Sequence, residues 1–199
     1  MIKIVTKDTI KECPNAVVID LTQPWNKLSP YYPYGDIPIN NTPYQYSSSV
    51  NEVWQKLYVN KKYNGVCKDT LFRKGIGINE YYTYEEARRK ILIPTYRWML
   101  QEKTLDIICK LREINKQGSI IMIVDRTTNT DIADISRPLS FAFLLKAYIE
   151  CTSPYEDAME EYEEHKTVTN GRKECDVVRI EKRPKLITIY NDAQRRFDF

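Results

Sequence analysis

The chain has 199 residues, of which 42% are hydrophobic and 29% charged, and its formal net charge is +3 at pH 7. These values are typical of a folded globular protein, exclude disorder throughout, and permit a phosphate-rich partner without requiring one. The single histidine, His165, excludes a two-histidine metal site, and its place in the acidic run "YEDAMEEYEEHK" indicates a solvated helix face rather than the core imidazole of a Ser/His/Asp centre. The sequence has no metal-ligand cluster, and we expect a site without metal or cofactor.

The sequence has no pattern of a membrane span or a secretion signal. No apolar run approaches the roughly 20 residues of a transmembrane helix. The start, "MIKIVTKDTIKEC", lacks a long apolar core and a small-residue cleavage site. Five widely spaced cysteines without a Cys-x-x-Cys pair are typical of reduced thiols. We expect a cytoplasmic protein with no membrane contact, and the Lys-, Ile-, Asn- and Tyr-rich composition suggests a phage or viral source.

The first elements predicted along the chain are a strand, a long loop and a helix. The β-branched "AVVIDLT", residues 16–22, predicts a buried strand. Residues 23–49 are dense in proline, aromatic and turn residues, and predict an ordered loop of the kind that often carries function. Ser49 then predicts an N-cap for a helix over residues 50–60, with apolar residues at helical spacing.

A long helical region follows. "TYEE", which begins at Thr83, has the spacing of a capping box. Pro94 should start or kink a second helical segment, because proline has no N–H and cannot continue the hydrogen-bond ladder. The apolar stripe of that segment ends at Gly118.

The next segments predict a buried strand over residues 119–125, a polar loop over residues 126–138, and a deeply packed helix over residues 139–150. The fold class is therefore α+β, a mostly helical single domain with a small sheet that spans residues 1–150. A C-terminal extension, residues 151–199, would add an acidic helix, short strands and a charged tail.

The arginines of the long helical region have two interpretations. Arg88, Arg89 and Arg97 are most simply a solvated face that pairs with Glu85 and Glu86. Alternatively they form a diphosphate clamp, because arginine offers bidentate donors to phosphate.

The aromatic and acidic candidates also have two interpretations. Trp54 fits core packing or ligand stacking, and Gln55 would then lie near the edge of the core. Asp125, Asp131 and Asp134 lie around a predicted strand end, loop and helix start. Asp134 or Ser136 fits helix capping, or a carboxylate there acts as a general base or holds ribose hydroxyls.

The order of these pieces resembles the NADAR family, the NAD- and ADP-ribose-associated N-glycosidases. "LSPYYPYGDIPI" resembles the entry loop of that family, and "SSSVNEVWQKLYV" its helix that ends in aromatic-Gln-x-x-Lys. "EEARRKILIPTYRWMLQEK" is similar to its Ala-Arg helix, and "TDIADISRPLS" to its Asp-bearing closing motif. The resemblance covers residues 15–150 and implies a NADAR-like fold.

The resemblance implies an activity as well. Such proteins remove ADP-ribose from modified guanine or cleave N-glycosidic bonds of phosphorylated nucleotides, without a metal. A carboxylate would stabilise the oxocarbenium-like centre or activate water, and a lysine can trap the opened sugar. The implied partner is an ADP-ribose-like or other phosphorylated nucleotide, and nucleic acid enters only as a modified-base substrate.

This chain departs from the family at both reactive positions. In register with Trp54 and Gln55, Asn51 stands where the family has glutamate and Tyr58 where it has lysine. We therefore keep two hypotheses: a hydrolase whose catalytic groups moved to Glu52, Lys56 or Asp134, and a non-catalytic nucleotide-binding or host-enzyme-blocking factor. The residues expected to contact the ligand are Tyr31, Tyr32, Asn51, Trp54, Gln55, Tyr58, Arg88, Arg89, Arg97, Asp131 and Arg137.

Overall fold

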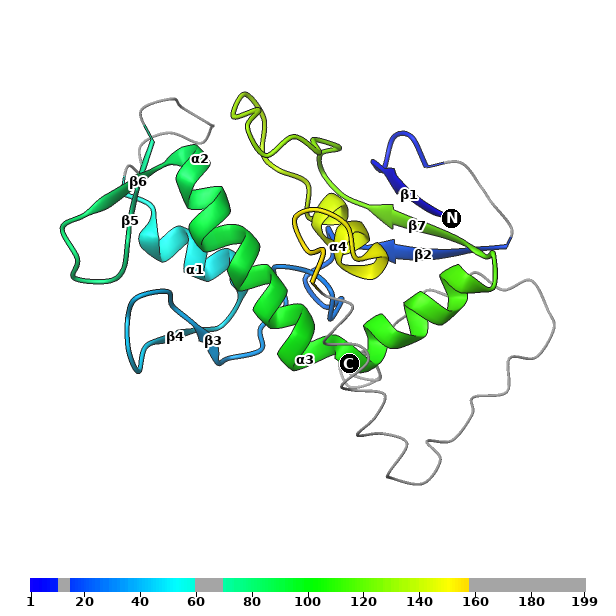
Figure 1. Ribbon diagram of the computed structural model, residues 1–199, viewed down its shortest axis with the longest axis horizontal. Helices are drawn as coiled ribbons and strands as arrows, with labels where there is room; N and C mark the ends of the chain where they lie inside the picture. The colour runs from blue at the N-terminus through cyan, green and yellow to red at the C-terminus, as the bar shows by residue number, and fades with distance from the viewer. Residues whose placement is uncertain (11–14, 60–69, 158–199) are drawn as a thin grey trace, which may run out of the picture.

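The largest sheet has three parallel strands with the sequence-late strand in the middle. The computed structural model describes residues 1–10, 15–59 and 70–157. In it, β1 (Ile2–Val5) and β2 (Ala16–Asp20) pair with either side of β7 (Ile120–Val124). The three arrowheads point to the same side of the molecule (Figure 1). The strands predicted over residues 16–22 and 119–125 are confirmed, each slightly shorter at its ends.

Burial explains why these segments form the sheet. The β7 sequence IIMIV is buried almost throughout, as expected for a central strand whose two neighbours are parallel. Helix α4 (Phe141–Glu150) packs against β1 and β7, and also against the long helix α3 (Ile93–Lys116). Side chains of α3, α4 and the sheet form one apolar cluster that also includes α1 (Val50–Leu57).

Two small antiparallel hairpins lie at the end of the molecule away from the parallel sheet (Figure 1). Strand β3 (Ile37–Pro38) pairs with β4 (Tyr46–Ser47), inside the segment predicted as a long loop. Strand β5 (Leu71–Arg73) pairs with β6 (Tyr81–Thr83). Sequence patterns indicated neither hairpin, because strands this short give no readable alternation.

The helix α1 confirms its predicted cap and is shorter than expected. Ser49 is extended and accepts a hydrogen bond from the Glu52 N–H at 3.1 Å. The helix ends at Leu57 rather than near residue 60, because Tyr58 is extended and forms a β-bridge with Phe72.

The long helical region is one continuous rod of three segments, in which a π-helical segment lies between two α-helical ones. A capping box at Thr83 and Glu86, as predicted, opens α2 (Tyr84–Ala87). A π-helical segment η1 (Arg88–Leu92) follows, in which the Ile93 N–H donates to the Arg88 carbonyl. Helix α3 then begins with Pro94 in its first turn.

The missing N–H of Pro94 explains this local geometry. The Lys90 carbonyl lies four residues before Pro94 and so receives no hydrogen bond from it. The side-chain amide of Asn40 donates to that carbonyl at 2.6 Å instead. Loop 23–49 is thereby attached to the π-helical segment.

No helix among the described residues is long and apolar enough to cross a membrane. Of the predicted extension, residues 151–157 are described and form turns. The rest of the predicted acidic helix, the strands, the charged tail and His165 lie outside the described residues.

Candidate functional site

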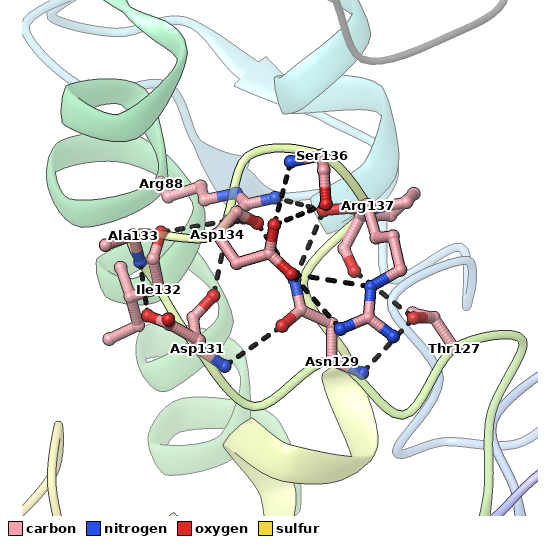
Figure 2. Close-up of polar contacts among 10 residues, drawn as sticks. Arg88, Thr127, Asn129, Asp131, Ile132, Ala133, Asp134, Ser136 and Arg137 are labelled. Carbon is pink, nitrogen blue, oxygen red and sulfur yellow. Dashed lines mark hydrogen bonds and ion pairs between the residues drawn. The ribbon is translucent and has the colours of Figure 1, made fainter.

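The predicted Asp loop is organised by a buried arginine. Arg88 is 0% exposed and reaches from η1 into the loop of residues 126–138 (Figure 2). Its Nη1 donates to the carbonyls of Ile132 at 2.9 Å and Asp134 at 2.8 Å, with a longer contact to that of Asp131. Its Nη2 donates to the Arg137 carbonyl. Arg88 therefore holds backbone, and neither a solvated face nor an open phosphate clamp describes it.

Carbonyl dipoles and an aromatic face compensate the buried charge of Arg88. The guanidinium carbon lies 4.8 Å from the centroid of the Tyr84 ring, a cation–π contact that strengthens when the cation is removed from water. Burial raises the pKa of the Tyr84 hydroxyl, and nearby Arg88 opposes that rise, so the ring stays neutral beside the cation.

The same loop is held from inside by Asn129, which is 2% exposed. Its amide donates to the carbonyls of Asp134 at 3.0 Å and Arg137 at 3.2 Å, and its oxygen accepts from the Asp131 N–H at 3.0 Å. Sequence reasoning passed over Asn129, because the length of a polar loop does not indicate which of its amides is buried.

The carboxylates of the loop serve local turns. Asp134 accepts from the backbone and hydroxyl of Ser136 and forms an ion pair with Arg137 at 3.1 Å. The Ser136 hydrogen bonds, with those of Arg137, lower the pKa of Asp134. Asp131 accepts from the Ala133 N–H at 2.8 Å. Both carboxylates cap turns within the loop. The helix capping predicted for Asp134 is wrong, because the helix begins at Phe141 and Ser140 is its N-cap.

Glu52 and Lys56 form a second local network at the start of α1. The Glu52 carboxylate accepts from the Ser48 N–H at 2.6 Å and from the Ser48 hydroxyl at 2.5 Å. Lys56 pairs with Glu52 at 3.2 Å. The Ser48 hydrogen bonds lower the pKa of Glu52, which makes it a weaker base than a free carboxylate.

Trp54 belongs to an aromatic cluster. Its ring lies 4.0 Å from that of Phe72 and 5.7 Å from that of Tyr84, centroid to centroid. The Tyr58 ring also packs on Phe72, 5.2 Å between centroids. This is the core-packing alternative for Trp54. Gln55, the next residue, is exposed.

The remaining basic candidates of the rod are paired with carboxylates. Arg89 forms an ion pair with Glu85 at 3.0 Å, as the simpler sequence interpretation predicted. Arg97 donates to both carboxylate oxygens of Asp157 at 2.9 Å. The structure does not bring these two arginines together with Arg88 as a clamp.

Polar side chains outside the Arg88 loop and the α1 network line a pocket. A pocket of about 400 Å³ lies at the carboxyl ends of the parallel strands. We call it the strand-end pocket, and its lining residues are Thr6, Lys7, Asp8, Thr22, Asp125 and Arg126.

The strand-end pocket combines a buried, hydrogen-bonded carboxylate with exposed cations. Asp125 is 7% exposed, and its carboxylate accepts from the Ser140 hydroxyl at 2.8 Å and the Ala142 N–H at 3.1 Å. Lys7 is 58% exposed and lies 3.8 Å from a carboxylate oxygen of Asp20. A long, solvent-exposed ion pair of this kind is weak and leaves the ammonium able to contact an anion.

The predicted entry loop reaches this pocket through Tyr31. The Arg126 guanidinium lies over the Tyr31 ring, 5.0 Å from its centroid. The neighbouring Pro30 carbonyl accepts from the Asn51 N–H at 2.9 Å, so the first turn of α1 lies beside the same loop. Tyr32 packs on Tyr34 instead, 4.6 Å between centroids. Of the predicted ligand contacts, Tyr31 thus lies against a pocket residue and Asn51 beside its loop.

Sequence patterns identified one end of the pocket and not the pocket itself. Asp125 was placed at a strand end, but Lys7 and Thr22 were not connected with it, because β1 was not recognised as a strand. The available signal was the apolar "IKIV" before a polar turn, which places Lys7 after a strand.

Among the described residues, no group of three His, Cys, Asp or Glu side chains is arranged to hold a metal ion.

Comparison with known proteins gives one family. A model described as a family of unknown function, DUF6939, matches residues 3–72 and 65–145, which is more than half of the chain. No curated protein and no solved structure matches the chain.

Proposed function

Because the chain belongs to the DUF6939 family, whose function is unknown, we propose its function from the pocket: it binds ADP-ribose or a related phosphorylated nucleotide without hydrolysing it. One observation carries the proposal, the presence of Lys7 and Arg126 beside hydroxyl and carboxylate groups in the strand-end pocket. Cations select phosphate, and the oxygens of Thr6, Thr22 and Asp8 suit the hydroxyls of a sugar.

The location of the pocket supports the same ligand class. In open sheets with parallel strands, ligands bind outside the carboxyl ends of the strands. Here those ends come from β1, β7 and β2, so three separate stretches of chain each supply a polar side chain. Such convergence of a few polar groups is typical of a small-molecule site.

The free donors of Arg126 support a phosphate contact. Among the described residues, none accepts a hydrogen bond from the Arg126 guanidinium, which makes a cation–π contact with Tyr31. A guanidinium whose carbon lies over a ring keeps its N–H groups available to other acceptors, and its planar fork matches the oxygens of a phosphate.

Binding without hydrolysis follows from the state of the candidate catalytic groups. Glu52 and Asp134 accept hydrogen bonds from neighbouring serines, and their pKa values are lowered, which weakens each as a general base. Lys56 is paired with Glu52. Two carboxylates line the pocket, Asp8 and Asp125, and Asp125 already accepts from Ser140 and Ala142. The NADAR resemblance is consistent with recognition of ADP-ribose and stays a prediction.

The test is calorimetric titration of the full chain with ADP-ribose, ribose 5-phosphate and adenosine. We expect saturable one-to-one binding of the two phosphorylated ligands and none of adenosine. A hydrogen bond to a charged group contributes about 1.5–3 kcal/mol, so Lys7→Gln and Arg126→Gln should each weaken binding about tenfold or more. Arg73→Gln removes the same charge from an exposed residue of β5 and should leave affinity unchanged.

Chromatography of the same mixtures separates binding from hydrolysis. Recovery of intact ligand, one per protein, supports the proposal. Release of free adenine from ADP-ribose in amounts above that of the protein would show an N-glycosidase and refute the non-catalytic part. Equal affinity of wild type and both pocket variants, or no binding of any phosphorylated ligand, would refute the assignment of the pocket.

A further inference from the structure

We propose that Arg88 is the positioning residue of the strand-end pocket: it fixes the loop of residues 126–138, and through that loop it sets the places of Asp125 and Arg126. The part of this inference that concerns ligand affinity rests on the proposed function. The part that concerns the loop does not, because it can be measured without ligand.

The first step of the connection is shared backbone. Arg88 and Asn129 donate to the same two carbonyls, those of Asp134 and Arg137 (Figure 2). Each of these carbonyls thereby has two donors, one from η1 and one from within the loop. The path of residues 134–137 is thus determined relative to the helical rod as well as to the loop itself.

The second step leads from Asn129 into the pocket. The Asn129 carbonyl accepts from the Ser140 N–H at 2.9 Å, and the Ser140 hydroxyl donates to the Asp125 carboxylate at 2.8 Å. The other carboxylate oxygen of Asp125 accepts from the Arg126 N–H at 2.7 Å. A contiguous series of hydrogen bonds therefore runs from the buried guanidinium to both pocket residues of this loop.

Arginine is required by the number and placement of the acceptors. The two terminal nitrogens of Arg88 serve four carbonyls spread over seven residues of loop, 131–137. The ammonium of lysine has three donors at one point and cannot span them. The Nε of Arg88 has no hydrogen-bond partner among the described residues, so the two terminal nitrogens alone position the planar guanidinium.

A matched control is present in the same rod. Arg112 is 4% exposed and donates from α3 to the carbonyls of Tyr148 at 2.7 Å and Ile149 at 3.2 Å. It anchors the end of α4 and not the loop of residues 126–138. Arg112→Lys thus removes a buried guanidinium of the same kind without touching the series of bonds that leads to the pocket.

The experiment compares Arg88→Lys with Arg112→Lys by amide hydrogen exchange on ligand-free full chain, and then by titration with ribose 5-phosphate. In Arg88→Lys we expect the Asp131 and Ser140 amides to exchange at least tenfold faster. The Asp125 amide donates to Val5 within the sheet and should exchange as in wild type. Affinity should fall about tenfold in Arg88→Lys and stay within twofold of wild type in Arg112→Lys.

Each outcome has one meaning. Unchanged exchange at Asp131 and Ser140 in a folded Arg88→Lys protein would overturn the inference. So would faster loop exchange with full ligand affinity, because the loop would then not set the pocket. If wild type binds no phosphorylated ligand, the proposed function fails, and local loss of protection confined to Arg88→Lys still supports control of the loop. If Arg88→Lys does not fold, Asn129→Ala, which removes the shared inner donor, takes its place with the same expectations.

Discussion

The guanidinium carbon of Arg126 lies over the ring of Tyr31, 5.0 Å from its centroid, and this contact joins the loop after β7 to the loop after β2. An exposed cation–π contact contributes about 0.5–1 kcal/mol. Tyr31→Leu should therefore change the free energy of unfolding by no more than this amount, yet weaken ribose 5-phosphate binding severalfold, because the guanidinium loses its orienting surface. Tyr31→Phe retains the ring and should bind as wild type. Equal binding by the Leu and Phe variants in titration calorimetry would contradict the role given to the ring.

Trp54 and Phe72 should affect stability and leave ligand binding intact. Phe72 is 0% exposed and touches the rings of Trp54, Tyr58 and Tyr84. Phe72→Ala should cost about 3–5 kcal/mol in urea unfolding. Trp54→Phe keeps an aromatic ring against Phe72 and should bind ligand like wild type. A large affinity loss in Trp54→Phe would restore the stacking interpretation.

The Ser48–Glu52 contact should stabilise the fold at neutral pH and lose this effect in acid. Because Ser48 lowers the pKa of Glu52 below its ordinary value of 4.5, the folded state favours the ionised form. The contribution is fully present above 4.5, the value for an unperturbed group, and disappears as pH falls through the lower folded-state pKa. Glu52→Gln should thus be less stable than wild type at pH 7 and equal to it near pH 2, as measured by urea unfolding. A constant difference across that range would exclude this linkage.

Asn40 and Pro94 should be energetically coupled through the Lys90 carbonyl. In wild type, Asn40 is the donor to that carbonyl, and its loss should cost about 1 kcal/mol. Pro94→Ala restores an N–H that can serve the carbonyl, so Asn40→Ala should cost less in that background. A double-mutant cycle of unfolding free energies measures the difference, and strict additivity would show that the proline does not create the need for Asn40.

Local signals in the sequence were sufficient for much of the fold. Ser49 and the Thr83 capping box were found because caps depend on side chains three residues apart. The buried strands β2 and β7 were found because their apolar runs are nearly uninterrupted. The α+β class followed, whereas the NADAR-like architecture and the domain limit at residue 150 stay predictions.

The site was harder to predict because it depends on pairings between distant segments. The charge of Arg88 indicated a solvated or ligand-facing side chain, and only tertiary structure supplies the carbonyls that make its burial tolerable. Lys7 and Arg126 become neighbours only through the pairing of β1 with β7. Periodicity within each segment carries no information on that pairing.

The central position of β7 also constrains how the chain can mature during synthesis. Ile2 pairs with Ile121 and Ile19 with Ile123, whereas β1 and β2 do not pair with each other. A nascent chain that has not yet exposed β7 to solvent therefore carries two apolar strands without partners, and contacts this distant in sequence form slowly. Unpaired strands of this kind are open to wrong association. Emergence of residues 120–124 from the ribosome is thus the event that closes the sheet and removes this hazard.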